Sequence, residues 1–154
     1  MELFNHRLRL HADPSRVVVR PFHIGWIANA NGVSRSQRLI SEVMDMSPQE
    51  ARDQLDLVLK DFEARHWQTR RVFMTRYDEI AAAHDLDGSR ISDEKRQLIG
   101  AYFCHEYSYA AAALMNPSAV PHPDQSGMED GAQRIVMSLR AVGEGHISSV
   151  AFRE

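Results

Sequence analysis

The chain has 154 residues, 44% of them hydrophobic and 25% charged, as in an ordinary globular protein large enough for one hydrophobic core. Its formal net charge of -3 argues against a dedicated binder of nucleic acid or another polyanion, which would usually be clearly basic. The single cysteine, Cys104, excludes an internal disulfide and a cysteine-based zinc site. We find no secretory signal and no run of about 20 apolar residues that would span a bilayer. We therefore expect a cytoplasmic protein without membrane contact.

The N-terminal part of the chain predicts one short strand followed by helices. The β-branched residues Val17 to Val19 favour a strand, which Pro21 would stop. Ser34 and Ser47 each begin a helix, because a glutamine or a glutamate three residues later completes a capping box. Apolar residues recur behind them at helical spacing and mark the buried faces: Leu39, Ile40, Val43, Met44, Ala51, Leu55, Val58, Leu59 and Phe62.

Two further helices complete a predicted bundle-like layer. The third covers Arg70 to His84 and ends at the turn Asp85 to Ser89. The fourth and longest runs from Asp93 to Leu114, where Asn116-Pro117 would stop it, because proline disfavours helical geometry in the residue before it. The inward residues of these two helices are Phe73, Tyr77, Ile80, Ala81, Leu98, Ile99, Tyr102, Phe103, Ala110, Ala113 and Leu114.

The segment from Arg134 to Arg153 predicts an antiparallel β-hairpin, and with it an α+β fold. Two apolar-rich runs flank Gly143-Glu144-Gly145, and a three-residue loop there would pair Arg140 with Ser148. Side chains alternate across a strand, so one face would carry Ser138, Arg140, His146 and Ser148. The other face would be apolar and would consist of Ile135, Met137, Leu139, Ala141, Ile147 and Ala151.

Several other clusters have simpler explanations than chemistry. His105-Glu106 does not match a zinc-protease motif, because Tyr109 stands where the second histidine would be. Cys104 lies among apolar residues, which indicates a small buried side chain rather than a nucleophile. Asp124 follows His122-Pro123, where the proline stiffens the loop, and is a better functional candidate than Glu129 and Asp130, for which solvation is a sufficient explanation. A basic cluster fits a solvated helix face, with a partner surface as the alternative, and contains Arg65, Arg70, Arg71 and Arg76.

Long ordered strings of this chain carry a family likeness. They are Asn116-Pro117-Ser118, Val120 to Gln125 and Ser138 to Ser149, preceded by Gly100 to Ser108 and by Val19 to Gly25 near the start. Together they resemble the β-mannoside phosphorylase family of glycosidases, glycoside hydrolase family 130, in a branch with an N-terminal helical extension.

The resemblance implies a five-bladed β-propeller preceded by helices, and inverting phosphorolysis or hydrolysis of β-mannosides. In the phosphorylases an aspartic acid donates its proton through a sugar hydroxyl while phosphate, a co-substrate, attacks the anomeric carbon. No metal or other cofactor is implied. Asn116 matches the asparagine that opens the first propeller segment, and Arg140 matches an arginine that reaches the bound sugar. Three further residues in matching strings are expected to line the pocket: Asp124, Glu144 and His146.

A five-bladed propeller needs roughly twenty strands, whereas one hairpin is predicted here. We therefore expect the N-terminal part of a longer enzyme, inactive by itself, with a helical extension over 1–115 and the opening propeller strands over 116–154. Its family's proton-donating aspartate would belong to later segments. The alternative is a non-catalytic helical module for homo-oligomerisation or partner binding. Nucleic acid is not expected as a partner.

Overall fold

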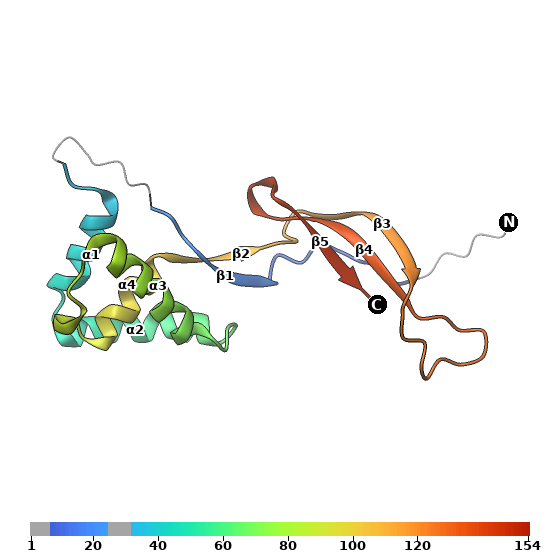
Figure 1. The fold of residues 1–154 in the computed structure, drawn as a ribbon, viewed down its shortest axis with the longest axis horizontal. Coiled ribbons are helices and arrows are strands. Elements are labelled where there is room, and N and C mark those ends of the chain that lie inside the picture. The colour runs from blue at the N-terminus through green and yellow to red at the C-terminus, as the bar shows by residue number, and fades with distance from the viewer. Residues whose placement is uncertain (1–6, 25–31) are drawn as a thin grey trace. The chain divides into compact units, whose positions relative to one another are not determined.

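The computed structural model of the protein describes residues 7–24 and 32–154. Two compact units form: Val18–Glu106, and residues 7–17 together with Tyr107–Glu154. The mixed α+β class is confirmed (Figure 1). The elements are β1 (Val17–Pro21), α1 (Arg35–Asp45), α2 (Pro48–Glu63), α3 (Thr69–His84), η1 (Gly88–Arg90), α4 (Asp93–Tyr102), β2 (Cys104–Ser108), β3 (Ala113–Pro121), β4 (Ile135–Val142), η2 (Glu144–His146) and β5 (Ser148–Arg153).

The first three helices begin close to where the sequence predicts, and the third also ends at the predicted residue, His84. Ser34 and Ser47 are the N-cap residues of α1 and α2, and both capping boxes are formed in full. Asp85 ends α3 in the left-handed conformation with φ 53°, in the predicted turn.

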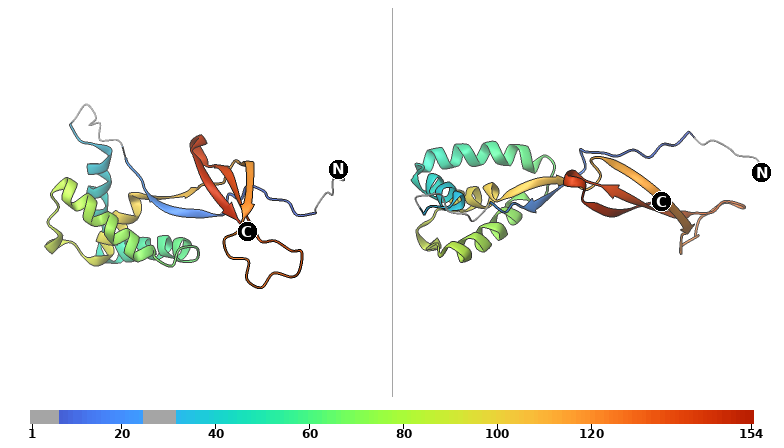
Figure 2. Two further views of the ribbon diagram at one scale, coloured as in Figure 1. Left: turned by 45° about the vertical axis from the view of Figure 1, so that its right-hand side comes forward. Right: turned by 90° about the horizontal axis from the view of Figure 1, so that it is seen from above.

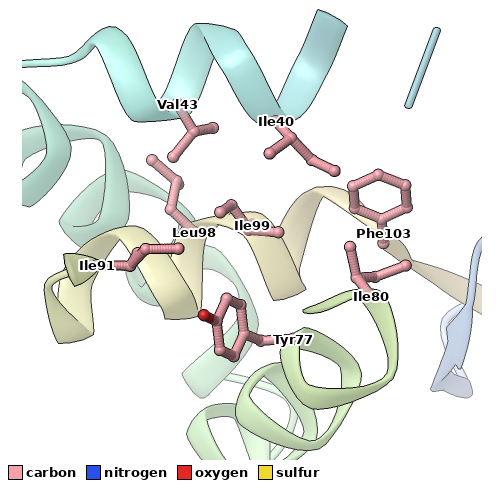
Figure 3. Close-up of a cluster of buried hydrophobic side chains, with 8 residues drawn as sticks. All are labelled: Ile40, Val43, Tyr77, Ile80, Ile91, Leu98, Ile99 and Phe103. Atoms are coloured by element: carbon pink, nitrogen blue, oxygen red, sulfur yellow. The ribbon is translucent and has the colours of Figure 1, made fainter. Parts of the chain in front are cut away.

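Helix α4 contacts the other three helices and shares a hydrophobic core with them. Figure 3 shows Ile40 and Val43 of α1 facing Leu98 and Ile99 of α4, whose side chains are fully buried. Gly100 allows α3 and α4 to approach closely, since a Cβ atom there would lie 1.9 Å from the Phe73 carbonyl oxygen. The inward faces predicted for α1, α2 and α3 are confirmed at Ile40, Val43, Ala51, Leu55, Leu59, Phe73, Tyr77 and Ile80, whereas Met44, predicted on the buried face of α1, is exposed.

The prediction of a helix from Asp93 to Leu114 is wrong beyond Tyr102. A continuing helix would need the Phe103 carbonyl to accept a hydrogen bond from the Tyr107 N–H. Instead the Phe103 carbonyl accepts from the Phe22 N–H at 2.7 Å and from Arg76 Nε at 3.1 Å. The chain continues as β2, which pairs with β1 in a two-stranded sheet. Tertiary hydrogen bonding has overridden the helical spacing of the apolar residues.

Arg76 was expected on a solvated helix face, and the structure contradicts this. The residue is only 8% exposed. Besides Phe103 its guanidinium donates to the Phe22 carbonyl, from Nη2 at 3.1 Å, and it forms an ion pair with Glu79. A buried arginine is stable only when its donors are satisfied in this way. Arg76 therefore fixes the end of α4 to the segment after β1.

The sheet region is a three-stranded antiparallel sheet in the order β3-β4-β5 rather than a lone hairpin. Ala113–Pro121, predicted as a helix end and a loop, is its first strand. Pro117 is tolerated in this strand for two reasons. β3 is an edge strand, and Pro117 lies at a bulge, where the hydrogen-bond ladder is interrupted between Met115 and Ser118. The long connection between β3 and β4 projects past the ends of these strands (Figure 2).

The predicted register of β4 and β5 is wrong by two residues. Arg140 pairs with Val150, and Val142 pairs with Ser148. The connection is longer than three residues, because Gly143 to Ile147 form the turn, closed by a bond of 2.9 Å from the Gly143 N–H to the Ile147 carbonyl. A shift of two residues keeps the side chains that remain in β4 and β5 on their predicted faces, whereas His146 and Ile147, predicted as strand residues, lie in the turn, and Ile147 is exposed rather than on an apolar face. Leu139 and Ala141 are accordingly buried and Arg140 is exposed.

The division into compact units falls between Glu106 and Tyr107. A domain boundary after residue 115 stays a prediction, but residues 1–115 hold more than the one strand expected, since β2 and the start of β3 lie there. Within the described ranges, every helix is too short or too polar to cross a bilayer.

Candidate functional site

Asn116 occupies an unusual backbone position in β3. Asn116 and Pro117 lie opposite the single residue Leu139, which defines the bulge. Asn116 has a φ of 53°, in the left-handed region that asparagine tolerates better than most residues. The extra residue redirects the strand locally, and bulges commonly turn a side chain toward a binding surface in this way.

Arg140 stands at the middle of the central strand with its guanidinium oriented by one neighbour. Its Nε and Nη2 atoms donate to the Ser148 hydroxyl oxygen at 3.0 and 2.9 Å. Ser148 is the diagonal neighbour across β4 and β5, within reach of a long side chain. The predicted proximity of these two residues is therefore confirmed, although through a different register. Among the described residues, no carboxylate lies within ion-pair distance of Arg140.

Asn116 and Arg140 line the same hollow on the exposed face of the sheet. The hollow has a volume of about 340 Å³, and its lining is Asn116, Ser138, Leu139, Arg140, Ser148, Ser149 and Val150. These seven residues supply amide, hydroxyl and guanidinium groups and no carboxylate. Phe152 lies across from Ser138 on the same face, with 63% of its surface exposed. The arrangement can bind a neutral hydroxyl-rich ligand, but it offers no general acid.

Glu144 and His146 are not brought to this hollow. Both lie in the η2 turn, and His146 has a φ of 60° and is exposed. The prediction that His146 shares a strand face with Arg140 is wrong, because the longer turn takes it out of β5. The Glu144 carbonyl accepts a hydrogen bond of 2.9 Å from the Tyr107 hydroxyl, which fastens the turn to β2.

Asp124 is engaged in the connection between β3 and β4. Hydrogen bonds from the Ser126 hydroxyl and the Ser126 N–H lower the pKa of this carboxyl below its usual value. The Asp124 N–H donates to Nδ1 of His122 at 2.9 Å, and Arg134 lies 3.6 Å from the carboxylate. Gln125 bridges the loop by accepting from the Arg134 N–H at 2.9 Å. These contacts give Asp124 a structural role in shaping the loop.

A second ordered polar cluster, which the sequence did not single out, lies in the helical unit. Glu106 accepts from Arg65 Nε at 2.8 Å and Nη2 at 3.1 Å, and contacts His66 Nε2 at 2.7 Å. The bond with Arg65 is the largest cause that lowers the pKa of Glu106. The sequence favours a partly buried histidine and glutamate that pack against a neighbour over a metal motif at His105-Glu106, and Glu106 is partly buried in contact with Arg65 and His66. The sequence did show a group of basic residues around His66. It could not show that Glu106, about 40 residues later, is their partner.

Cys104 opens β2 and is half-buried against the core of the helical unit. Burial raises the pKa of its thiol to about 11. At neutral pH the thiol is protonated and therefore a poor nucleophile. In the described part of the chain, no three His, Cys, Asp or Glu side chains are placed to hold a metal ion.

A scan against models of known protein families, a search of curated proteins and a search of solved structures each found no match.

Proposed function

We propose that this chain supplies a sugar-binding surface of an enzyme that acts on β-mannosides by phosphorolysis or hydrolysis, of the glycoside hydrolase family 130 type. The observation that carries the proposal is that Asn116 and Arg140, the two residues matched by the family resemblance, line one exposed hollow. They are far apart in the sequence, and the β3 bulge and the β4 register bring them together.

The chemistry of the hollow suits a pyranose. Arginine, asparagine and serine side chains can donate to and accept from sugar hydroxyls, and the orientation of Arg140 by Ser148 reduces the entropy lost on binding. In this proposal Nη1 of Arg140 remains available for the ligand. The β3-β4-β5 sheet would be part of the first blade of a propeller.

We assign binding rather than turnover to this chain. Glycosyl transfer needs a proton for the leaving oxygen, usually from a carboxylic acid. The hollow has no carboxylate, and Asp124 is held by Ser126 and Arg134 in its own loop. A phosphate ion would find only one cation, Arg140, among the lining residues. The proton donor and the remaining phosphate ligands are therefore expected outside this surface.

The test is a titration of the ¹⁵N-labelled chain with β-1,4-mannobiose, followed through its amide and arginine Nε–H signals. We expect saturable shifts at Asn116, Arg140 and Ser148. Arg140→Ala should weaken binding about tenfold or more, since a hydrogen bond to a charged group contributes about 1.5–3 kcal/mol. Arg153→Ala is the matched control on the opposite face of the sheet. Equal loss in both variants, or no saturable shift at millimolar sugar, would contradict the proposal.

A further inference from the structure

Trp67 is the most exposed of the large hydrophobic side chains in the described part of the chain, at 87% of its surface. Free exposure of an indole in water is unfavourable, because the ring is a large apolar surface. The turn that carries Trp67, between α2 and α3, is nevertheless firmly held. His66 before it contacts Glu106, and Thr69 after it is buried and bonds to the His66 carbonyl. The structure therefore presents Trp67 on a preorganised support.

A hollow of about 200 Å³ opens next to this turn in the same compact unit. Gln68, which directly follows Trp67, lines it, and the Gln68 side chain accepts a hydrogen bond from Arg71. The other lining residues add hydroxyl, carboxylate and short apolar groups: Pro21, Val72, Thr75, Arg76, Glu79 and Cys104. The hollow thus offers an amide, guanidinium groups and a hydroxyl, beginning at the residue that directly follows Trp67 in the chain.

The charges around Trp67 indicate what kind of ligand fits. Arg65 is paired with Glu106, Arg70 with Glu63, and Arg76 with Glu79. An acidic partner would have to compete with these carboxylates for three of the guanidinium groups, and only Arg71, which donates to the neutral Gln68, has no ion pair with a carboxylate among the described residues. A neutral ligand does not compete with the carboxylates, and it can use the remaining donors and acceptors of Gln68, Arg71 and Thr75.

We propose that Trp67, with Gln68 and Arg71, forms a second carbohydrate-binding surface, which belongs to the helical unit and holds a neutral oligosaccharide. A pyranose ring has a face of C–H groups that packs against an aromatic ring, and hydroxyls at its edge that hydrogen-bond to amide and guanidinium groups. The surface extends the proposed function with an additional docking point and does not depend on the sheet.

The experiment is an NMR titration of the full chain with β-1,4-mannotetraose, observing the two indole N–H signals. Trp67→Phe assigns the Trp67 signal and distinguishes it from that of Trp26. We expect a saturable shift of the Trp67 indole and the Gln68 amide, and about tenfold weaker binding at this surface in Trp67→Ala. Leu57→Ala is the control, because Leu57 is also an exposed apolar residue of the helical unit, at 61% exposure. It should leave the titration unchanged.

Arg140→Ala separates the two proposals. If the Trp67 response persists in Arg140→Ala, this surface binds independently, as proposed. If Arg140 responds and Trp67 does not, this inference is wrong while the sheet site stands. If neither responds, both fail. Self-association that Trp67→Ala abolishes, without any shift on adding the sugar, would make Trp67 a protein-contact residue and overturn the inference.

Discussion

Arg76 and Arg140 carry the same side chain but use their N–H donors in different ways. Arg76 directs its donors to two main-chain carbonyls and a carboxylate, so it is satisfied within the protein and is 8% exposed. Arg140 directs Nε and Nη2 to one hydroxyl and faces solvent. All three guanidinium nitrogens of Arg76 donate within the protein, whereas Arg140 donates from Nε and Nη2 and keeps Nη1 for a ligand. The first residue stabilises the fold, and the second is positioned for recognition.

The Glu106 carboxylate should make the free energy of unfolding depend on pH. Arg65 and His66 lower its pKa in the folded state below the unfolded value of about 4.3. Its stabilisation is therefore fully present above that value and is lost as the pH falls through the lower folded pKa. We expect Glu106→Gln to reduce the free energy of unfolding by about 1 kcal/mol at pH 7, a difference that shrinks below about pH 4. Urea unfolding of both proteins from pH 3 to 8 measures it.

Glu42→Gln is the control for this prediction, because Glu42 is exposed and lies 3.7 Å from Arg38. It should change stability little at any pH. An equal effect of the two substitutions, or a Glu106→Gln deficit that persists at pH 3, would show that the Arg65-Glu106 contact contributes no charge-dependent stability.

Among the elements, the contact between α3 and α4 depends on the missing side chain of Gly100. A methyl group there would overlap the main chain of Phe73, which cannot move without shifting α3. We expect Gly100→Ala to lower the free energy of unfolding by about 3 kcal/mol, at the upper end of the range for overpacking. Gly88→Ala is the control, since its Cβ would meet only the Tyr77 hydroxyl at 3.3 Å. Thermal unfolding measures both, and a cost in the control as large as in Gly100→Ala would contradict this explanation.

The elements also show which parts of the fold the sequence could predict. Helices α1 and α2 were predictable because Ser34 and Ser47 fix their starts through contacts within a few residues. The end of α4 was not, because it depends on bonds from Phe22 and Arg76 to the Phe103 carbonyl. The alternation of β4 gave the correct faces, whereas its register depended on the turn geometry. The shared hollow of Asn116 and Arg140 needed the bulge in β3, which Pro117 alone did not reveal.

At the level of the whole molecule, each compact unit has its own buried residues and its own proposed surface. The helical unit contains both hydrophobic clusters and the Trp67 turn, while Leu139, Ala141 and Val142 are buried in the unit that contains the Arg140 hollow. Variants designed for one surface should therefore leave the fold of the other unit intact. This independence is required for the Arg140 and Trp67 experiments to be interpretable.

Hydrogen exchange tests the independence directly. Leu98 in α4 is 0% exposed and Leu139 in β4 is 6% exposed, so replacement of either by alanine should cost about 2–5 kcal/mol. We expect Leu98→Ala to increase exchange of the amides of α1 to α4 and to leave those of β4 protected, because the lost packing lies within the helical unit. Leu139→Ala should have the reverse effect. If either variant exposed the amides of both units to the same extent, the two units would unfold as one cooperative structure, and a change at Trp67 would no longer report on its own surface alone.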